Sequence, residues 1–274
     1  MSVSKTKKLI ESSIMVAIAA VLSMIKLFDL PYGGSVTIGC MLPVIVIAYR
    51  HGIRWGLISG LVFGIIQQLL GLNTLSYVTT WQSIVAVILL DYIIAFLMLG
   101  FGGIFKKAFG QPLALLSGTV FVCILRYICH VISGATVWAG LSIPTNAALI
   151  YSLGYNATYM IPETIVTCVL AYYVGSILDF GGNDIAHLAS SSNESVSVYN
   201  VMGGLLLAAA LVFDTRSVFG KLQNPESGDF DITGLSNVSW VSLAAVTAAC
   251  VLASTFLFIY ASRKKKETGS SDIE

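Results

Sequence analysis

The sequence predicts an all-α polytopic membrane protein, in which a six-helix bundle is followed by a C-terminal two-helix hairpin. Hydrophobic residues make up 56% of the 274 residues and charged residues only 11%, and the mean hydropathy is +0.85. Apolar runs long enough to cross a hydrocarbon layer of about 30 Å, at about 1.5 Å per residue, recur along the chain. Outer-membrane barrels show instead an alternating pattern over about ten residues, so we expect helices.

Eight apolar runs are predicted to span the membrane. The first is expected to stay as a span, because it lacks the small-residue cleavage site of a signal peptide. A Ser-, Asn- and Gly-rich stretch after Phe180 predicts a linker. We therefore expect a six-span membrane domain at 1–180, a linker at 181–199 and an accessory segment with two spans at 200–274. The predicted spans are 8–26, 35–50, 54–72, 82–104, 113–139, 147–178, 197–213 and 238–261.

Basic residues predict the orientation of these spans. Cytoplasmic loops carry an excess of Lys and Arg, and the basic clusters here precede the first span, separate alternate spans and follow the last. An even number of spans with both termini in the cytoplasm satisfies every cluster, which predicts a multi-pass protein of the cell membrane. The clusters are Lys5, Lys7 and Lys8, then Arg50 and Arg54, then Lys106 and Lys107, and finally Arg263, Lys264, Lys265 and Lys266.

Two predicted outside loops stand out. The Gly-rich segment 28–39 is too polar for a helix interior, and it is either a lid or a plain turn. The loop at 71–81 contains Tyr77 and Trp81, which are either interfacial anchors or walls of a site. The sequence leaves both alternatives open.

Several classes of chemistry have no support in the sequence. The chain contains no G-x-x-x-x-G-K-[ST] phosphate loop, so we expect no cofactor and no ATP hydrolysis by this chain itself. Its three histidines form no H-x-x-x-H or H-E-x-x-H motif, so no metal site is expected. The basic residues are short flanks of spans, which argues against nucleic acid as a partner and leaves membrane lipid. The five cysteines are expected to be free and buried.

Four ionisable residues lie inside the first six spans: Asp91, Arg126, His130 and Glu163. Such residues are costly in hydrocarbon unless they face a partner or a water-filled cavity. One explanation is that they only pair with one another, with a carboxylate neutralising Arg126. The other is a ligand site, since Arg126, His130, Gly134 and Trp138 recur every fourth residue and share one stripe of a helix.

Aromatic and amide side chains near these residues favour the ligand site. Carboxylates, an imidazole, an amide and aromatic faces suit a flat, cationic, hydrogen-bonding small molecule. Asp91 or Glu163 would counter its charge, Trp138 and His130 would stack on it, and Asn156 would offer a donor and an acceptor. Arg126 would hold a carboxylate in place. The neighbours that complete this set are Tyr92, Tyr151, Tyr155 and Tyr159.

The adjacent residues Gln67 and Gln68 lie in the third span on different faces of its helix. Polar side chains in membrane helices often bond to a neighbouring helix. One of the two glutamines is therefore expected to satisfy such a neighbour.

Three motifs together resemble a known membrane family. They are RYICHVISGATVWAG at 126–140, YSLGYN at 151–156, and the pair Asp91 and Tyr92. The chain is similar over about residues 8–180 to the thiamine-specific substrate-binding (S) components of energy-coupling factor vitamin transporters. This resemblance implies a six-helix S component that binds thiamine from outside. Its partners would be a transmembrane coupling subunit and two ATPase subunits, which hydrolyse the ATP that drives uptake.

The resemblance also implies roles for individual residues. Arg126, His130 and Trp138 match the basic, His and Trp positions of the family's fifth span; Asp91 and Tyr92 match span four, and Tyr151 and Asn156 match span six. The chain departs from the pattern where Asp91 replaces Glu, Arg126 replaces Lys, and Gly34 stands near an expected Trp. Tyr77 or Trp81 would then supply the missing stacking wall.

The family docks to its coupling subunit through small residues on the first span. Ser13 and Ala17 stand four residues apart there and would allow a partner helix to approach closely. Ordinary packing within the protein is the alternative explanation for such small residues.

Three alternatives remain open from sequence. An S component for another vitamin or precursor keeps the same scaffold. A membrane-embedded enzyme would use Asp91, His130 and Glu163 as general acid and base. An ion-coupled secondary carrier would use the intramembrane carboxylates to bind its driving ion.

Overall fold

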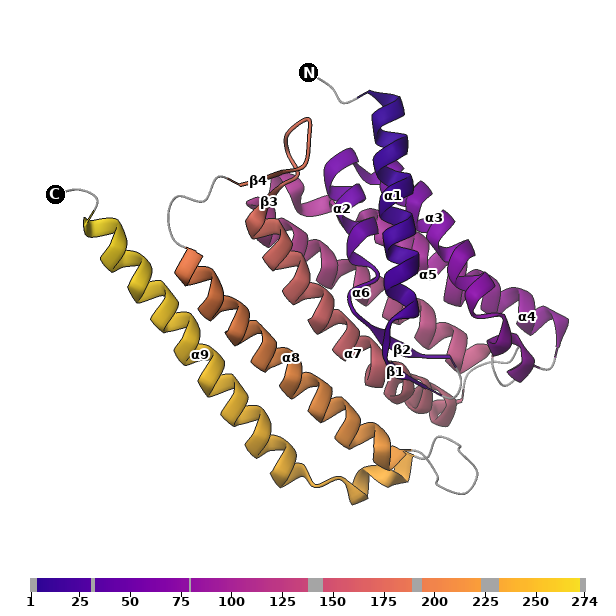
Figure 1. Cartoon of the computed structure of the whole chain (residues 1–274). Helices are drawn as coiled ribbons and strands as arrows, with labels where there is room; N and C mark the ends of the chain where they lie inside the picture. Colours follow the sequence, from indigo (N-terminus) through magenta and orange to yellow (C-terminus); the bar gives the residue numbers. More distant parts are fainter. Residues whose placement is uncertain are drawn as a thin grey trace. The chain divides into compact units, whose positions relative to one another are not determined.

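The structure is a computed structural model that describes residues 4–30, 33–78, 80–137, 145–188, 194–222 and 232–271. The chain forms two units, Met1–Leu188 and Ala189–Glu274, which are described separately. Figure 1 traces the helices of each unit in chain order.

The first unit is built from helices with two short hairpins, which confirms the predicted all-α class. Its fourth helical segment changes type twice, because α4 continues into a π-helix at Ile88–Ile94 and then into α5. Short 3-10 turns at Leu72–Tyr77, Met98–Phe101 and Ile104–Lys107 complete the unit. The helices are α1 (Lys5–Met24), α2 (Leu42–His51), α3 (Ile53–Leu70), α4 (Trp81–Val87), α5 (Ala95–Leu97), α6 (Gln111–Thr136) and α7 (Asn146–Ile177), and the strands are β1 (Lys26–Asp29), β2 (Ser35–Thr37), β3 (Leu178–Asp179) and β4 (Ala186–His187).

Within the described ranges, six helical stretches are long and apolar enough to cross a membrane: Ile53–Leu70, Trp81–Lys107, Gln111–Thr136, Ala148–Ile177, Val198–Leu222 and Trp240–Ala261. The predicted span at 35–50 is wrong in its first half. There β2 pairs antiparallel with β1, and α2 begins only at Leu42 and has 10 residues. Gly39, with a φ of 67° that disfavours other residues, separates the strand from the helix.

Helix α3 packs closely on the segment that follows α4. Its buried face carries Gly56, Gly60 and Gly64 at a spacing of four. A Cβ on Gly60 would lie 2.5 Å from the carbonyl oxygen of Phe96, and one on Gly64 would lie 2.7 Å from that of Tyr92. Only glycine permits this approach of two backbones, which is a common device between membrane helices.

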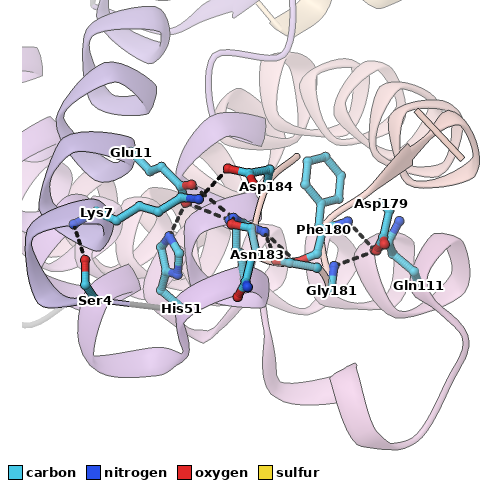
Figure 2. Close-up of polar contacts among 12 residues, drawn as sticks. Ser4, Lys7, Glu11, His51, Gln111, Asp179, Phe180, Gly181, Asn183 and Asp184 are labelled. Atoms are coloured by element: carbon cyan, nitrogen blue, oxygen red, sulfur yellow. Dashed lines mark hydrogen bonds and ion pairs between the residues drawn. The ribbon is translucent and has the colours of Figure 1, made fainter. Parts of the chain in front are cut away.

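A polar node joins α1, α2 and the β3–β4 hairpin at one end of the first unit (Figure 2). Arg50 donates to both carboxylate oxygens of Glu11, at 2.6 and 3.0 Å. The same guanidinium donates to the backbone carbonyls of Phe180, Gly182 and Asn183. Since the Arg50 side chain is only 2% exposed, these bonds are shielded from solvent. They tie residues 180–183, which include the start of the expected linker, to the first unit.

The second unit is the predicted helical hairpin, with α8 (Glu194–Leu222), a 3-10 turn at Ile232–Asn237 and α9 (Trp240–Ser271). The single hydroxyl of Thr247 on α9 donates to the carboxylate of Asp214 on α8, with its oxygen 2.8 and 2.6 Å from the two carboxylate oxygens. Ser254 donates to the carbonyl of Gly203. The intramembrane carboxylate of this unit is thus satisfied by the opposite helix.

Candidate functional site

The centre of the candidate site is Asp91, which lies on the π-helix Ile88–Ile94. π-Helical turns are rare and occur often at functional sites. Nδ1 of His130 lies 2.8 Å from Oδ1 of Asp91, and the hydroxyl of Ser133 donates to Oδ2 at 2.6 Å. His130 and Ser133 are three residues apart on α6 and so share one face of that helix. One helix therefore holds both oxygens of a carboxylate from another.

Arg126 lies one turn before His130 and extends the same row. Its Nη2 atom is 3.4 Å from Nε2 of His130, its Nη1 contacts the Met41 sulfur, and its guanidinium carbon lies 4.3 Å from the Phe96 ring centroid. We predicted that Arg126 holds a carboxylate directly. The structure does not show this, because none of the ion pairs among the described residues includes Arg126. On the side of Asp91, Arg126 contacts His130.

Asn156 joins α7 to the row on α6. Its Nδ2 donates to the Ser152 carbonyl at 2.9 Å and to the His130 carbonyl at 3.3 Å, and its Oδ1 accepts from the Tyr159 hydroxyl at 2.7 Å. The Tyr159 ring lies edge-on to His130, with centroids 6.1 Å apart. Much of the hydrogen-bonding capacity of this amide is therefore used within the protein.

The first outer loop reaches α7 at two levels. A Cβ on Gly34 would lie 2.5 Å from Cδ1 of Tyr159, so the loop backbone lies directly against that ring. One turn further along α7, Glu163 accepts from the Thr37 backbone N–H at 2.6 Å and from its hydroxyl at 2.7 Å. Glu163 therefore anchors β2, and its hydrogen bonds to Thr37 are made with this loop.

The remaining predicted site residues lie around this group. The hydroxyl of Tyr92 pairs with that of Thr74 at 2.8 Å. Tyr77 and Tyr151 are 47% and 41% exposed, and the Tyr151 ring stacks on Tyr155 with centroids 6.2 Å apart. Trp138 lies outside the described residues. Stacking by Trp138 thus remains a prediction.

Sequence reasoning missed two members of the group. Ser133 is not among the predicted site residues, although its spacing of three from His130 places it on the same face of the helix. Phe96 under Arg126 carried no sequence signal, because its position depends on how α5 packs against α6. Among the described residues, His, Cys, Asp and Glu side chains form no group of three that would hold a metal. The arrangement offers a held carboxylate, an imidazole and aromatic edges, which suits binding of an organic cation.

Comparison with known proteins identifies the family. Residues 9–178 match the family described as thiamine transporter protein (Thia_YuaJ). This chain belongs to the thiamine transporter family. It is 35% identical over 175 residues to the thiamine transporter ThiT of Bacillus subtilis, covering 60% of this chain and 87% of that protein. It is 28% identical over 179 residues to ThiT of Lacticaseibacillus paracasei, covering 59% of this chain and 83% of that protein.

A solved structure of ThiT from Listeria monocytogenes shares the fold of this thiamine transporter family member. The TM-score is 0.50 at 24% identity, and the match covers 62% of this chain and 94% of that one. Membership of a transporter family confirms the expectation that the chain is not an enzyme. Together with the six apolar helices, it makes the chain a multi-pass membrane protein.

The predicted docking residues of this family member both lie at the surface of the first unit. Ser13 and Ala17 are exposed on α1, and the Ser13 hydroxyl donates to the Leu9 carbonyl of its own helix at 2.9 Å. Bonding within its own helix lowers the cost of placing this hydroxyl in hydrocarbon. The two small side chains are therefore accessible to a partner helix.

Proposed function

We propose that this chain captures thiamine from outside the cell as the substrate-binding subunit of an ATP-driven energy-coupling factor transporter. The observation that carries this proposal is the Asp91 carboxylate, which His130 and Ser133 hold in a thiamine transporter family member; the Tyr159 ring lies edge-on to His130. Thiamine carries a permanently cationic thiazolium ring and a flat aminopyrimidine. A fixed carboxylate with aromatic neighbours complements both features.

Each residue of the candidate site would have its own role in thiamine binding. Asp91 would lie against the thiazolium, with His130 and Ser133 fixing its orientation. Trp138, Tyr151 and Tyr77 would supply aromatic faces, and Tyr92 and Asn156 would bond to polar groups of the ligand. Arg126 would act by positioning His130. Gly34 and Glu163 would set the position of the first outer loop over the site.

The partners follow from the same proposal. A coupling subunit would approach α1 at Ser13 and Ala17, and two ATPase subunits attached to it would hydrolyse ATP. Residues 1–180 would form the substrate-binding domain, 181–199 the linker, and 200–274 an accessory hairpin. Both termini would lie in the cytoplasm, where the basic clusters favour them.

Ligand titration tests the proposal directly. The detergent-purified protein is titrated with thiamine while Trp fluorescence is followed, with riboflavin, biotin and the thiamine phosphates as competitors. Saturable quenching by thiamine, reduced in a Trp138→Phe variant that still binds by calorimetry, is the expected result. A response to a different vitamin instead would keep the transporter class and discard the ligand.

If none of these vitamins changed the Trp fluorescence, an ion-coupled carrier would be favoured. That carrier would transport alone in proteoliposomes under an ion gradient. An S component requires its coupling subunits, so uptake that depends on co-expressed ATPases separates the two.

A further inference from the structure

The third helix of the bundle carries a buried amide that has no hydrogen-bond partner in the part of the chain that the structure describes. Gln68 is 8% exposed, and neither Oε1 nor Nε2 has a hydrogen-bond partner among the residues that the structure describes. A buried amide without partners costs roughly 1–3 kcal/mol by protein mutational measures. Membrane helices normally avoid this cost by bonding to a neighbouring helix.

Its neighbour Gln67 shows how the chain satisfies such a group. Nε2 of Gln67 donates to the hydroxyl of Ser23 on α1 at 2.7 Å. The two glutamines are adjacent and point to different faces of α3. Gln67 therefore has a structural role between two helices, and Gln68 faces another part of the bundle.

Close contacts on either side of Gln68 identify that part. Gly64, one turn before it, lies against the Tyr92 carbonyl, because a Cβ on Gly64 would lie 2.7 Å from that oxygen. Gly71, three residues after it, lies against the Tyr92 hydroxyl, with a corresponding separation of 2.6 Å. Residues 64, 68 and 71 share one face of the helix. Gln68 is thus placed on the face that meets Tyr92, the residue after Asp91.

We infer that Gln68 is a further ligand-binding residue, whose amide pairs with a heteroaromatic edge that carries a hydrogen-bond donor beside an acceptor. The amide of Asn156 is largely used by Ser152, His130 and Tyr159, whereas that of Gln68 retains its two donors and its acceptor. The inference rests on the proposed function, since the aminopyrimidine of thiamine is such an edge. Specificity of this kind arises because an analogue that lacks the matching groups leaves the buried amide unpaired.

Two matched variants test this inference. Gln68→Met keeps the length of the side chain and removes the amide, and Gln67→Met makes the same change one residue away. Affinity for thiamine and for oxythiamine, in which an oxo group replaces the amino group of the pyrimidine, is measured by calorimetry. Thermal unfolding of each variant is followed without ligand.

The two variants are expected to change different quantities: Gln68→Met the ligand affinity, and Gln67→Met the unfolding temperature. Gln68→Met weakens thiamine binding at least about tenfold and reduces the preference for thiamine over oxythiamine, while its unfolding temperature stays the same or rises. Gln67→Met lowers the unfolding temperature and leaves thiamine affinity unchanged. A structural role for Gln68 would instead lower its unfolding temperature, as at Gln67.

Failure of the Gln68 inference can be told apart from failure of the proposed function. Unchanged thiamine affinity in Gln68→Met, or failure of that variant to fold, contradicts the role of Gln68 while wild-type binding supports the proposed function. Absence of thiamine binding in the wild type contradicts the proposed function itself.

Discussion

His130 and Asp91 form the central pair of the candidate site, with Nδ1 of the imidazole 2.8 Å from Oδ1 of the carboxylate. Ser133 holds the second oxygen. The Asp91 side chain is 12% exposed and that of His130 is 8% exposed, so the pair lies in a largely dehydrated setting. There, a carboxylate interacts more strongly with a cation than it would in water.

Replacing Asp91 by Asn tests this charge. Asp91→Asn keeps the shape of the side chain and removes its charge, so we expect thiamine affinity to fall at least about tenfold, or about 1.4 kcal/mol. Calorimetry on the purified protein gives the change. Asp214→Asn is the matched control, because Asp214 is a second aspartate on a helix of membrane-spanning length, bonded to Thr247 within the hairpin. Equal loss of affinity in both variants would contradict the role of Asp91.

Gly34 tests the contact between the first outer loop and α7. In Gly34→Ala the new Cβ would lie 2.5 Å from Cδ1 of Tyr159, so the ring or the loop must move. Overpacking of this kind costs about 1–3 kcal/mol, and we expect a lower unfolding temperature together with weaker thiamine binding. Gly110→Ala is the control, since a Cβ there meets nothing within 4 Å. An unperturbed Gly34→Ala would show that the loop does not rest on Tyr159.

Replacing Arg50 by Lys tests how much the polar node in Figure 2 contributes to stability. Lys keeps the positive charge but lacks the planar fork that reaches Glu11 and three backbone carbonyls together. We expect Arg50→Lys to reduce the free energy of unfolding by about 2–3 kcal/mol, measured by chemical denaturation in detergent. Thiamine affinity should be retained, because no residue of the node belongs to the candidate site. Arg54→Lys, at an exposed position on α3, should change neither quantity.

Replacing Ser13 by Leu tests whether the coupling subunit docks on α1. Ser13→Leu adds bulk to the exposed small-residue face of α1, so we expect uptake by cells that co-express the coupling module to be lost while thiamine binding is unchanged. Ser176→Leu is the matched control. Both serines are exposed and donate to the carbonyl four residues earlier, that of Leu9 or of Tyr172. Uptake that persists in Ser13→Leu would move the docking surface elsewhere.

The sequence by itself determined the class of the protein and most of the polar residues that need explaining. Long apolar runs cross hydrocarbon only as helices, because every backbone polar group must be satisfied within the segment. The same cost marks Asp91, His130 and Glu163 as residues that require partners. These arguments depend only on composition and spacing along the chain.

Only the tertiary structure decided which partner each polar group received. Asp91 pairs with His130 and Ser133 rather than with Arg126, and Glu163 holds Thr37 in a loop far away in sequence. Gln67 finds Ser23, while its neighbour Gln68 remains unpaired among the described residues. Spacing along one helix fixes which side chains share a face, but hydrogen bonds need specific atoms within about 3 Å. That proximity depends on how separate helices pack together, which local sequence does not specify.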